Sequence, residues 1–368
     1  MIQVAKTPLP SLEEYNRYLK MIWKSNWVTN DGDLVKKLEV KLASMFGIDS
    51  LALVVNGTVG LQLAIKALDL KGEIITTPFT FAATTNVILW EGLRPVFADI
   101  NPNTFNIDPK EVEKKITKNT TAILAVHVFG NPCDIDALST IAQKYNIKLI
   151  FDAAHAFGVK YKNKSVLKFG DVSVLSFHAT KTFHTIEGGA VISKDKKIRK
   201  NLRLMRNFGI ASEEKVLLCG INAKMNEFQA AMGLSNISYI PSVLRKRKNI
   251  YKEYKKAFLG VRDITFQSLI TDDYNYSYMP VLFKNKRMRD LIYTMLEING
   301  IKARKYFYPL TSNFPYIKKS ANNSFLPNAH KVSNSILCLP IFSDMKIEDV
   351  KRITSIIKKI IYEEYEKK

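Results

Sequence analysis

The sequence is poor in cysteine and contains no long hydrophobic run. Its three cysteines, Cys133, Cys219 and Cys338, form no CxxC pair, so we expect neither a disulfide framework nor a zinc or other metal site. Nothing in the sequence approaches the roughly 18 consecutive apolar residues of a membrane-spanning helix, and the first residues lack the apolar core of a signal peptide. These absences predict a protein without a membrane span, located in the reducing cytoplasm.

Acidic residues are also few. The chain has 34 Asp and Glu against 55 Lys and Arg, a formal net charge of +21. A nucleic-acid-binding protein is therefore the first hypothesis to test. Lysine carries most of the excess and is scattered along the chain, apart from one cluster at 245–248, and no RNP, helix-turn-helix or zinc signature accompanies it. We expect no nucleic-acid partner, and we interpret the excess as a solvated surface.

The 368 residues, 46% of them hydrophobic, are enough for two domains or one large α/β unit with an appendage. Short strand-like runs alternate with helix-like segments, and these runs are 51–55, 73–77, 95–99, 122–127, 148–152, 172–177 and 189–192. Because the runs are apolar nearly throughout, they predict a mainly parallel sheet covered by helices on both faces. The pattern changes near residue 240, which predicts a large domain of residues 1–240 and a smaller α+β domain of residues 241–368.

Polar residues end several of these runs. In open parallel sheets, ligands bind at the carboxyl ends of the strands. By position, Asn56, His127, Asp152 and Ser176 are therefore candidate site residues. His127 fits a core histidine better than a ligand.

Three elements together indicate a pyridoxal phosphate (PLP) site. Lys181 lies just past a buried run, where desolvation favours the neutral amine that forms a Schiff base. Asp152 ends another run, where a carboxylate keeps a pyridine nitrogen protonated, although a helix N-cap is an equally good interpretation in isolation. Gly57 and Thr58 stand at a strand-to-helix turn, which suits a phosphate but also an ordinary helix start.

The order and spacing of the motifs resemble the DegT/DnrJ/EryC1/StrS family of nucleotide-sugar aminotransferases over nearly the whole chain. The segments that carry the resemblance are 27–32, 56–58, 78–84, 132–134, 152–155, 176–189, 220–225, 304–309 and 337–340. The resemblance implies fold type I of the PLP-dependent transferases, the aspartate-aminotransferase-like fold. It also implies an amino group moving from L-glutamate to a nucleotide-linked keto sugar.

The resemblance also implies roles for individual residues. Lys181 matches the lysine to which PLP is bound, and Asp152 matches the partner of the pyridine nitrogen. The other implied cofactor contacts are Gly57, Thr58 and Ser176 at the phosphate, Phe81 stacked on the ring and His155 near the ring and its 3-hydroxyl. Asn222 matches an asparagine that reaches the phosphate of the other subunit, which implies a homodimer with shared sites. Candidate substrate contacts are Trp27, Asn30, His178, Glu187, Arg304 and Tyr306.

Within the family, the segment from Ser176 to Gly189 is more similar to members that aminate C4 of the sugar. The expected reaction converts dTDP-4-keto-6-deoxyglucose to dTDP-4-amino-4,6-dideoxyglucose, for O-antigen or another surface glycan. Amination at C3, a UDP- or GDP-linked sugar, and a regulatory protein on the same fold remain alternatives. Sugar dehydratases of the family replace the lysine by histidine, which Lys181 argues against. Lys224 departs from the arginine that many members have.

Overall fold

The computed structural model describes residues 1–317 and 325–366. At its centre is a seven-stranded sheet in the order β1-β9-β8-β5-β4-β2-β3. The strands are β1 (Ala52–Val54), β2 (Glu73–Thr76), β3 (Arg94–Phe97), β4 (Thr120–Val126), β5 (Lys148–Asp152), β8 (Val172–Ser176) and β9 (Gly189–Ile192). Strands β3, β2, β4, β5 and β8 pair in parallel, and β9 is antiparallel to both β8 and β1. The prediction of a mainly parallel sheet from the seven apolar runs is confirmed.

Alternate residues of each strand enter two different cores, because successive side chains of a strand point to opposite faces. Ile74 and Ile150 pack on one face, while their neighbours Ile75 and Phe151 pack on the other. Helices α3 (Gly57–Ala67), α4 (Ala82–Trp90) and α7 (Lys196–Met205) contribute to the first core. Helices α2 (Asp33–Phe46), α5 (Pro109–Lys114), α6 (Ile135–Lys144) and α8 (Glu227–Asn236) contribute to the second. Both faces are covered, which explains why these strands are apolar throughout.

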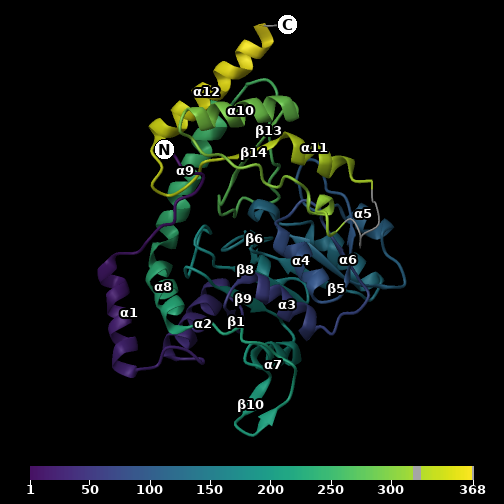
Figure 1. Ribbon diagram of the computed structural model, residues 1–368, viewed down its shortest axis with the longest axis vertical. Helices are drawn as coiled ribbons and strands as arrows, with labels where there is room; N and C mark the ends of the chain where they lie inside the picture. Colours follow the sequence, from purple (N-terminus) through teal and green to yellow (C-terminus); the bar gives the residue numbers. More distant parts are fainter. Residues whose placement is uncertain (318–324, 367–368) are drawn as a thin grey trace.

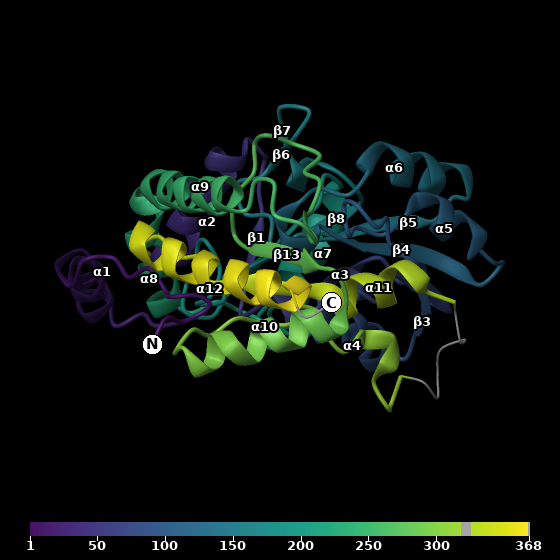
Figure 2. The same cartoon turned by 90° about the horizontal axis from the view of Figure 1, so that it is seen from above.

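The C-terminal part forms a second unit around its own core. Its antiparallel sheet consists of β12 (Ile264–Phe266), β13 (Met279–Phe283) and β14 (Ile336–Leu339). Its helices are α9 (Ile240–Ala257), α10 (Lys286–Ile298), α11 (Pro327–Ser335) and α12 (Ile347–Glu366). Helix α12 packs against α9 and α10 (Figure 2). We propose the division into 1–240 and 241–368 because α9 begins there, although Ile2 pairs with Ile301 of the second unit.

The remaining elements lie at the periphery (Figures 1 and 2). Helix α1 (Leu12–Ser25) packs on α8 through an edge-to-face contact of Trp23 with Phe228. The hairpin of β10 (Ile210–Ser212) and β11 (Lys215–Val216) is exposed and projects from the body, and the short strands β6 (Lys160–Tyr161) and β7 (Lys164–Ser165) form another hairpin. Across residues 1–317 and 325–366, no helix is long and apolar enough to cross a membrane. The same residues contain no group of three or more His, Cys, Asp or Glu placed to hold a metal ion.

Candidate active site

A cavity of about 430 Å³ lies at the carboxyl ends of the central strands, where the C-terminal unit meets the sheet. Its walls bring together most of the residues that the sequence predicts for the site. These are Gly57, Thr58, Phe81, Asp152, His155, Ser176, His178, Lys181, Glu187, Arg304 and Tyr306. The cavity therefore unites residues from five separate parts of the chain, and one of these parts, 304–306, belongs to the C-terminal unit.

Lys181 lies in the loop between β8 and β9, and its amine points into the cavity wall formed by Tyr278. The Nζ atom donates a hydrogen bond of 3.3 Å to the Tyr278 hydroxyl. Burial lowers the pKa of the Lys181 amine, against the opposing effects of Asp152 and Tyr306. Since a neutral amine is the nucleophilic form, this environment favours covalent chemistry at Nζ.

Asp152 is the last residue of β5, and both of its carboxylate oxygens have donors. Thr84 of α4 donates to Oδ2 at 2.7 Å and the Ala154 N–H donates to Oδ1 at 3.0 Å. The residues directly after Asp152 form turns and not a helix, so the helix N-cap interpretation is wrong. Burial raises the pKa of the Asp152 carboxyl, opposed by its hydrogen bonds and by Lys181. A buried carboxylate with a raised pKa is stabilised by a cationic partner.

The turn between β1 and α3 provides donors for an anion. Helix α3 begins at Gly57, capped by the Asn56 side chain, which accepts from the Val59 N–H at 2.9 Å. Within the described residues, the N–H groups of Gly57 and Thr58 have no acceptor. A Cβ atom at Gly57 would lie 3.0 Å from the Ser176 Cβ, so glycine allows the turn to approach the Ser176 hydroxyl. Helix N-termini of this kind bind phosphate groups.

Two aromatic residues complete the cavity. Phe81 is exposed to it, directly before α4. His155 Nδ1 accepts from the Phe129 N–H at 3.3 Å, so the neutral ring carries its proton on Nε2. Burial and the charge of Lys181 lower the pKa of His155 well below its usual value. His155 therefore stays uncharged at neutral pH.

Three predicted site residues lie outside this cavity: Trp27, Asn30 and Asn222. The Trp27 side chain is 53% exposed, and Asn222 accepts from the Lys224 amine at 2.9 Å. Asn30 has a φ of 59°, in the left-handed region that asparagine tolerates. All three occupy surface segments next to a buried ionic network.

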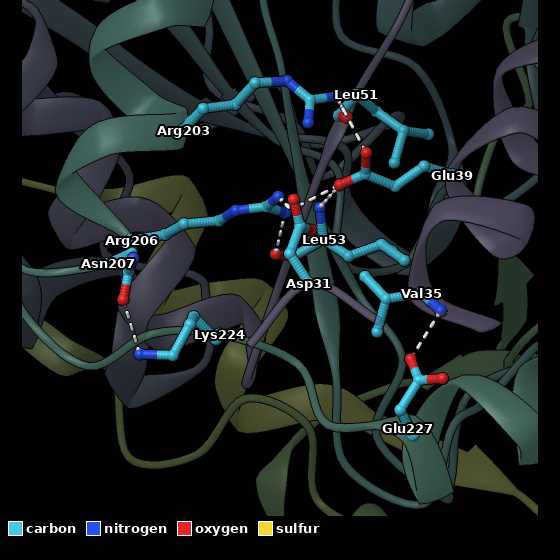
Figure 3. A network of polar contacts seen from close by, with 10 residues as sticks. All are labelled: Asp31, Val35, Glu39, Leu51, Leu53, Arg203, Arg206, Asn207, Lys224 and Glu227. Carbon is cyan, nitrogen blue, oxygen red and sulfur yellow. Dashed lines mark hydrogen bonds and ion pairs between the residues drawn. The ribbon is translucent and has the colours of Figure 1, made fainter. Parts of the chain in front are cut away.

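The centre of that network is Arg206, which follows α7 (Figure 3). Its guanidinium, 5% exposed, bonds Glu39 and Asp31 at 2.7 Å each, and Arg203 bonds the other oxygen of Glu39 at 2.8 Å. The Arg206 carbonyl accepts from the Ala223 N–H at 2.9 Å. Both surface segments, the one before Gly32 and the one around Asn222, are thus attached to the same arginine.

Replacing Arg206 by alanine is expected to lower the free energy of unfolding by about 3–5 kcal/mol, because Glu39 and Asp31 lose a buried partner. Urea denaturation measures the change as a lower midpoint with an unchanged slope. Arg203→Ala is the control, since that side chain is 39% exposed and its loss is expected to cost about 1 kcal/mol. Equal losses in the two variants would show that Arg206 is not the centre of the network.

His127 illustrates a strand-end residue that does not enter the site. It is fully buried and stacks on Phe151, with ring centroids 4.7 Å apart. Its Nδ1 accepts from the Cys133 N–H, whereas Nε2 has no partner in the described parts of the chain. Burial lowers its pKa to about 3, so the ring is neutral. The interpretation of His127 as a core residue is confirmed.

Sequence reasoning missed Tyr278 and Thr84, which contact Lys181 and Asp152 directly. Thr80 and Thr84 have hydroxyl oxygens 2.8 Å apart, one helical turn apart in sequence. Two signals were available for Thr84: this i, i+4 spacing of hydroxyls, and its place in the segment 78–84 that carries the resemblance. Tyr278 carries no motif that would have distinguished it from neighbouring tyrosines.

The chain is similar to known proteins in both sequence and fold. Residues 11–358 match the DegT/DnrJ/EryC1/StrS aminotransferase family. The chain is 42% identical over 362 residues to the dTDP-4-amino-4,6-dideoxy-D-glucose transaminase of Escherichia coli, covering 97% of this chain and 98% of that one. It is 41% identical over 365 residues to the transaminase of the same name from Shigella dysenteriae, covering 98% and 99%. The crystal structure of DesI with its TDP-sugar product superposes with a TM-score of 0.91 at 31% identity, covering 98% and 93%.

Proposed function

This chain belongs to the DegT/DnrJ/EryC1/StrS aminotransferase family, and from that premise we propose a specific reaction for it. The enzyme transfers the amino group of L-glutamate to C4 of dTDP-4-keto-6-deoxyglucose and forms dTDP-4-amino-4,6-dideoxyglucose. The observation that carries the proposal is the cavity that holds Lys181, Asp152 and the N-terminus of α3 together. The 42% identity to a transaminase named for that product supports the choice of sugar.

The cavity fits PLP as cofactor. The free N–H groups of Gly57 and Thr58, with the Ser176 hydroxyl, would hold its phosphate. Asp152 would bind the pyridine nitrogen. Burial raises the pKa of the Asp152 carboxyl, and a protonated ring nitrogen beside it would stabilise the carboxylate and offset that effect. When bound, PLP supplies an electron sink for the carbanion formed at the reacting carbon.

The chain's own residues then perform acid–base and positioning tasks. Lys181 takes up a proton and returns it, and its lowered pKa brings the amine closer to the pH at which both steps are efficient. Asp152 keeps the proton on the ring nitrogen, held in place by Thr84 and the Ala154 N–H. Because amino donor and keto acceptor use the same cavity in turn, ping-pong kinetics are expected.

Polar side chains at the cavity rim are proposed substrate contacts. The guanidinium of Arg304 contacts the Tyr306 hydroxyl and is the proposed partner of the glutamate carboxylate or the nucleotide diphosphate. His178 Nε2 and Glu187 lie 3.5 Å apart, where they would contact sugar hydroxyls.

We also propose a cytoplasmic homodimer in which each subunit completes the other's site. In support, Trp27, Asn30 and Asn222 lie outside this chain's cavity. They belong to the surface segments that contain Asp31 and Ala223, both of which bond to Arg206. The product would be used for O-antigen or another surface glycan of the cell. Arg206 would then position the surface segments that contribute to the partner subunit's site.

The test is to incubate the purified enzyme with PLP, L-glutamate and a panel of dTDP-, UDP- and GDP-linked keto sugars, and to locate the new amine by NMR. The expected product carries the amine on C4 of the dTDP sugar. An amine on C3, or turnover of a UDP or GDP sugar alone, would overturn the proposed substrate. A protein that binds PLP but transfers no amine to any keto sugar would favour the regulatory alternative.

A further inference from the structure

Residues 277 and 278 of the C-terminal unit contact residues 181 and 182 of the catalytic loop in two neighbouring places. The Tyr278 hydroxyl accepts from Lys181 Nζ at 3.3 Å. The Ser277 and Thr182 hydroxyl oxygens lie 2.5 Å apart. Two consecutive residues of one unit thus meet two consecutive residues of the other, immediately before strand β13.

The ring of Tyr278 has little freedom to move. It packs against His155, Phe129 and Tyr306, with centroid distances of 4.8, 5.2 and 6.0 Å. Three aromatic neighbours restrict the rotamer of the ring. The hydroxyl is therefore held beside Lys181 by packing as well as by its hydrogen bond.

A buried arginine also fixes the backbone at Ser277. Arg247 of α9 is fully buried and donates to the carbonyls of Ser277 at 3.2 Å and Ile341 at 3.3 Å. The Nε atom of its guanidinium has no hydrogen-bond partner in residues 1–317 and 325–366. Burying a cation that is bonded only to carbonyl groups costs free energy. In return, its hydrogen bond fixes the backbone at Ser277, next to Tyr278.

Tyr278 carries no charge at neutral pH. Burial raises the pKa of its phenol, despite the opposing charges of Arg247 and Arg304. A neutral phenol oxygen accepts a hydrogen bond from an amine and from an ammonium group alike. The contact can therefore persist while Lys181 gains and loses its proton.

We propose that Tyr278 is a further catalytic residue, which holds the free amine of Lys181 in position for proton transfer, while the Ser277–Thr182 contact fixes the loop. The proposal rests on the proposed function of Lys181. Because a hydrogen bond to the phenol oxygen favours the ammonium form over the amine, we expect its loss to lower the pKa of Lys181 further, against the opposing effects of Asp152 and Tyr306.

The first test compares the Tyr278→Phe and Tyr276→Phe holoenzymes. Tyr276 lies two residues away, packs on Tyr251 and Tyr274 and does not contact Lys181. Tyr278→Phe is expected to lower kcat about tenfold or more with little change in KM for the sugar, and to move the acidic limb of the pH profile down by about one unit. Tyr276→Phe is expected to match the wild type. Wild-type kcat and pH profile in Tyr278→Phe would overturn the proposal.

A second readout does not depend on activity. Cyanate carbamoylates neutral amines, so its rate at Lys181 in the cofactor-free chain, followed by mass spectrometry against pH, reports the protonation of Nζ. The midpoint is expected to shift down by about one pH unit in Tyr278→Phe and to stay in place in Ser277→Ala, which keeps the phenol. An equal shift in both variants would contradict a specific role of Tyr278. A shift in Tyr278→Phe alone, in a protein that transaminates no sugar, would uphold the contact and reject the proposed function.

Discussion

Lys181→Ala is expected to lower kcat/KM by about 10⁴-fold or more, because in the proposed function this side chain is both nucleophile and proton carrier. The fold is expected to survive, since the described contacts of the Lys181 side chain are one hydrogen bond to Tyr278 and a cation–π approach to the same ring. Burial also lowers the pKa of the amine, so the charged form is destabilised in the folded chain. Steady-state kinetics and thermal unfolding measure the two properties separately.

Lys164→Ala is the matched control, because that lysine lies in the exposed hairpin of β6 and β7 and is expected to leave both properties unchanged. Mixing inactive Lys181→Ala subunits with Asn222→Ala subunits extends the test to the dimer. If each subunit completes the other's site, mixed dimers contain one site with both native residues and regain activity. Turnover by Lys181→Ala at more than a few per cent of wild type would reject the assigned role.

Asp152→Asn is expected to lower turnover by about 100-fold, the effect of losing a charge-assisted bond worth roughly 3 kcal/mol. Asparagine keeps the size of the side chain and can still accept from the Ala154 N–H. What it loses is the negative charge that, in the proposed function, would hold a proton on the ring nitrogen of PLP. Single-turnover measurements with L-glutamate alone detect the loss in the first half-reaction.

Although Asp152→Asn is expected to lower turnover, it is not expected to destabilise the cofactor-free chain. The folded pKa of Asp152 is raised above 3.8, so between the two values the native state binds more protons than the unfolded state. The free energy of unfolding therefore falls as pH rises through this window, and the loss is complete above the folded pKa. At neutral pH, cofactor-free Asp152→Asn is expected to melt no lower than the wild type.

With PLP added, the wild type is expected to melt at a higher temperature than Asp152→Asn, since only the wild type offers the ring nitrogen a carboxylate. Melting curves with and without the cofactor therefore provide the measurement, and Thr84→Val serves as a comparison that removes a donor to Asp152 but keeps its charge. A cofactor-free Asp152→Asn chain that is clearly less stable than the wild type would show that the carboxylate has a structural role. Full turnover in that variant would reject its role toward the ring.

Local sequence features were sufficient to predict the sheet and to identify Asp152 and Lys181 as candidate site residues. A run such as Leu149-Ile150-Phe151 is apolar on both faces, and only a strand covered on both sides buries every side chain. Asp152 and Lys181 were identifiable because each follows such a run, and the ends of parallel strands meet at one edge. The partners of these two side chains and the raised pKa of the Asp152 carboxyl were not identifiable, because those depend on what packs above them.

The sequence by itself determined the alternation of strands and helices, the lysine and carboxylate at the strand ends, and the helix N-terminus at Gly57. These are properties of neighbouring residues, set by side-chain periodicity and backbone preference. Only the tertiary structure decided that Tyr278 meets Lys181, 97 residues away, and that Arg206 joins Asp31 to the Ala223 segment. Contacts between segments distant in sequence leave no periodic pattern, because they form only when separate cores bring those segments together.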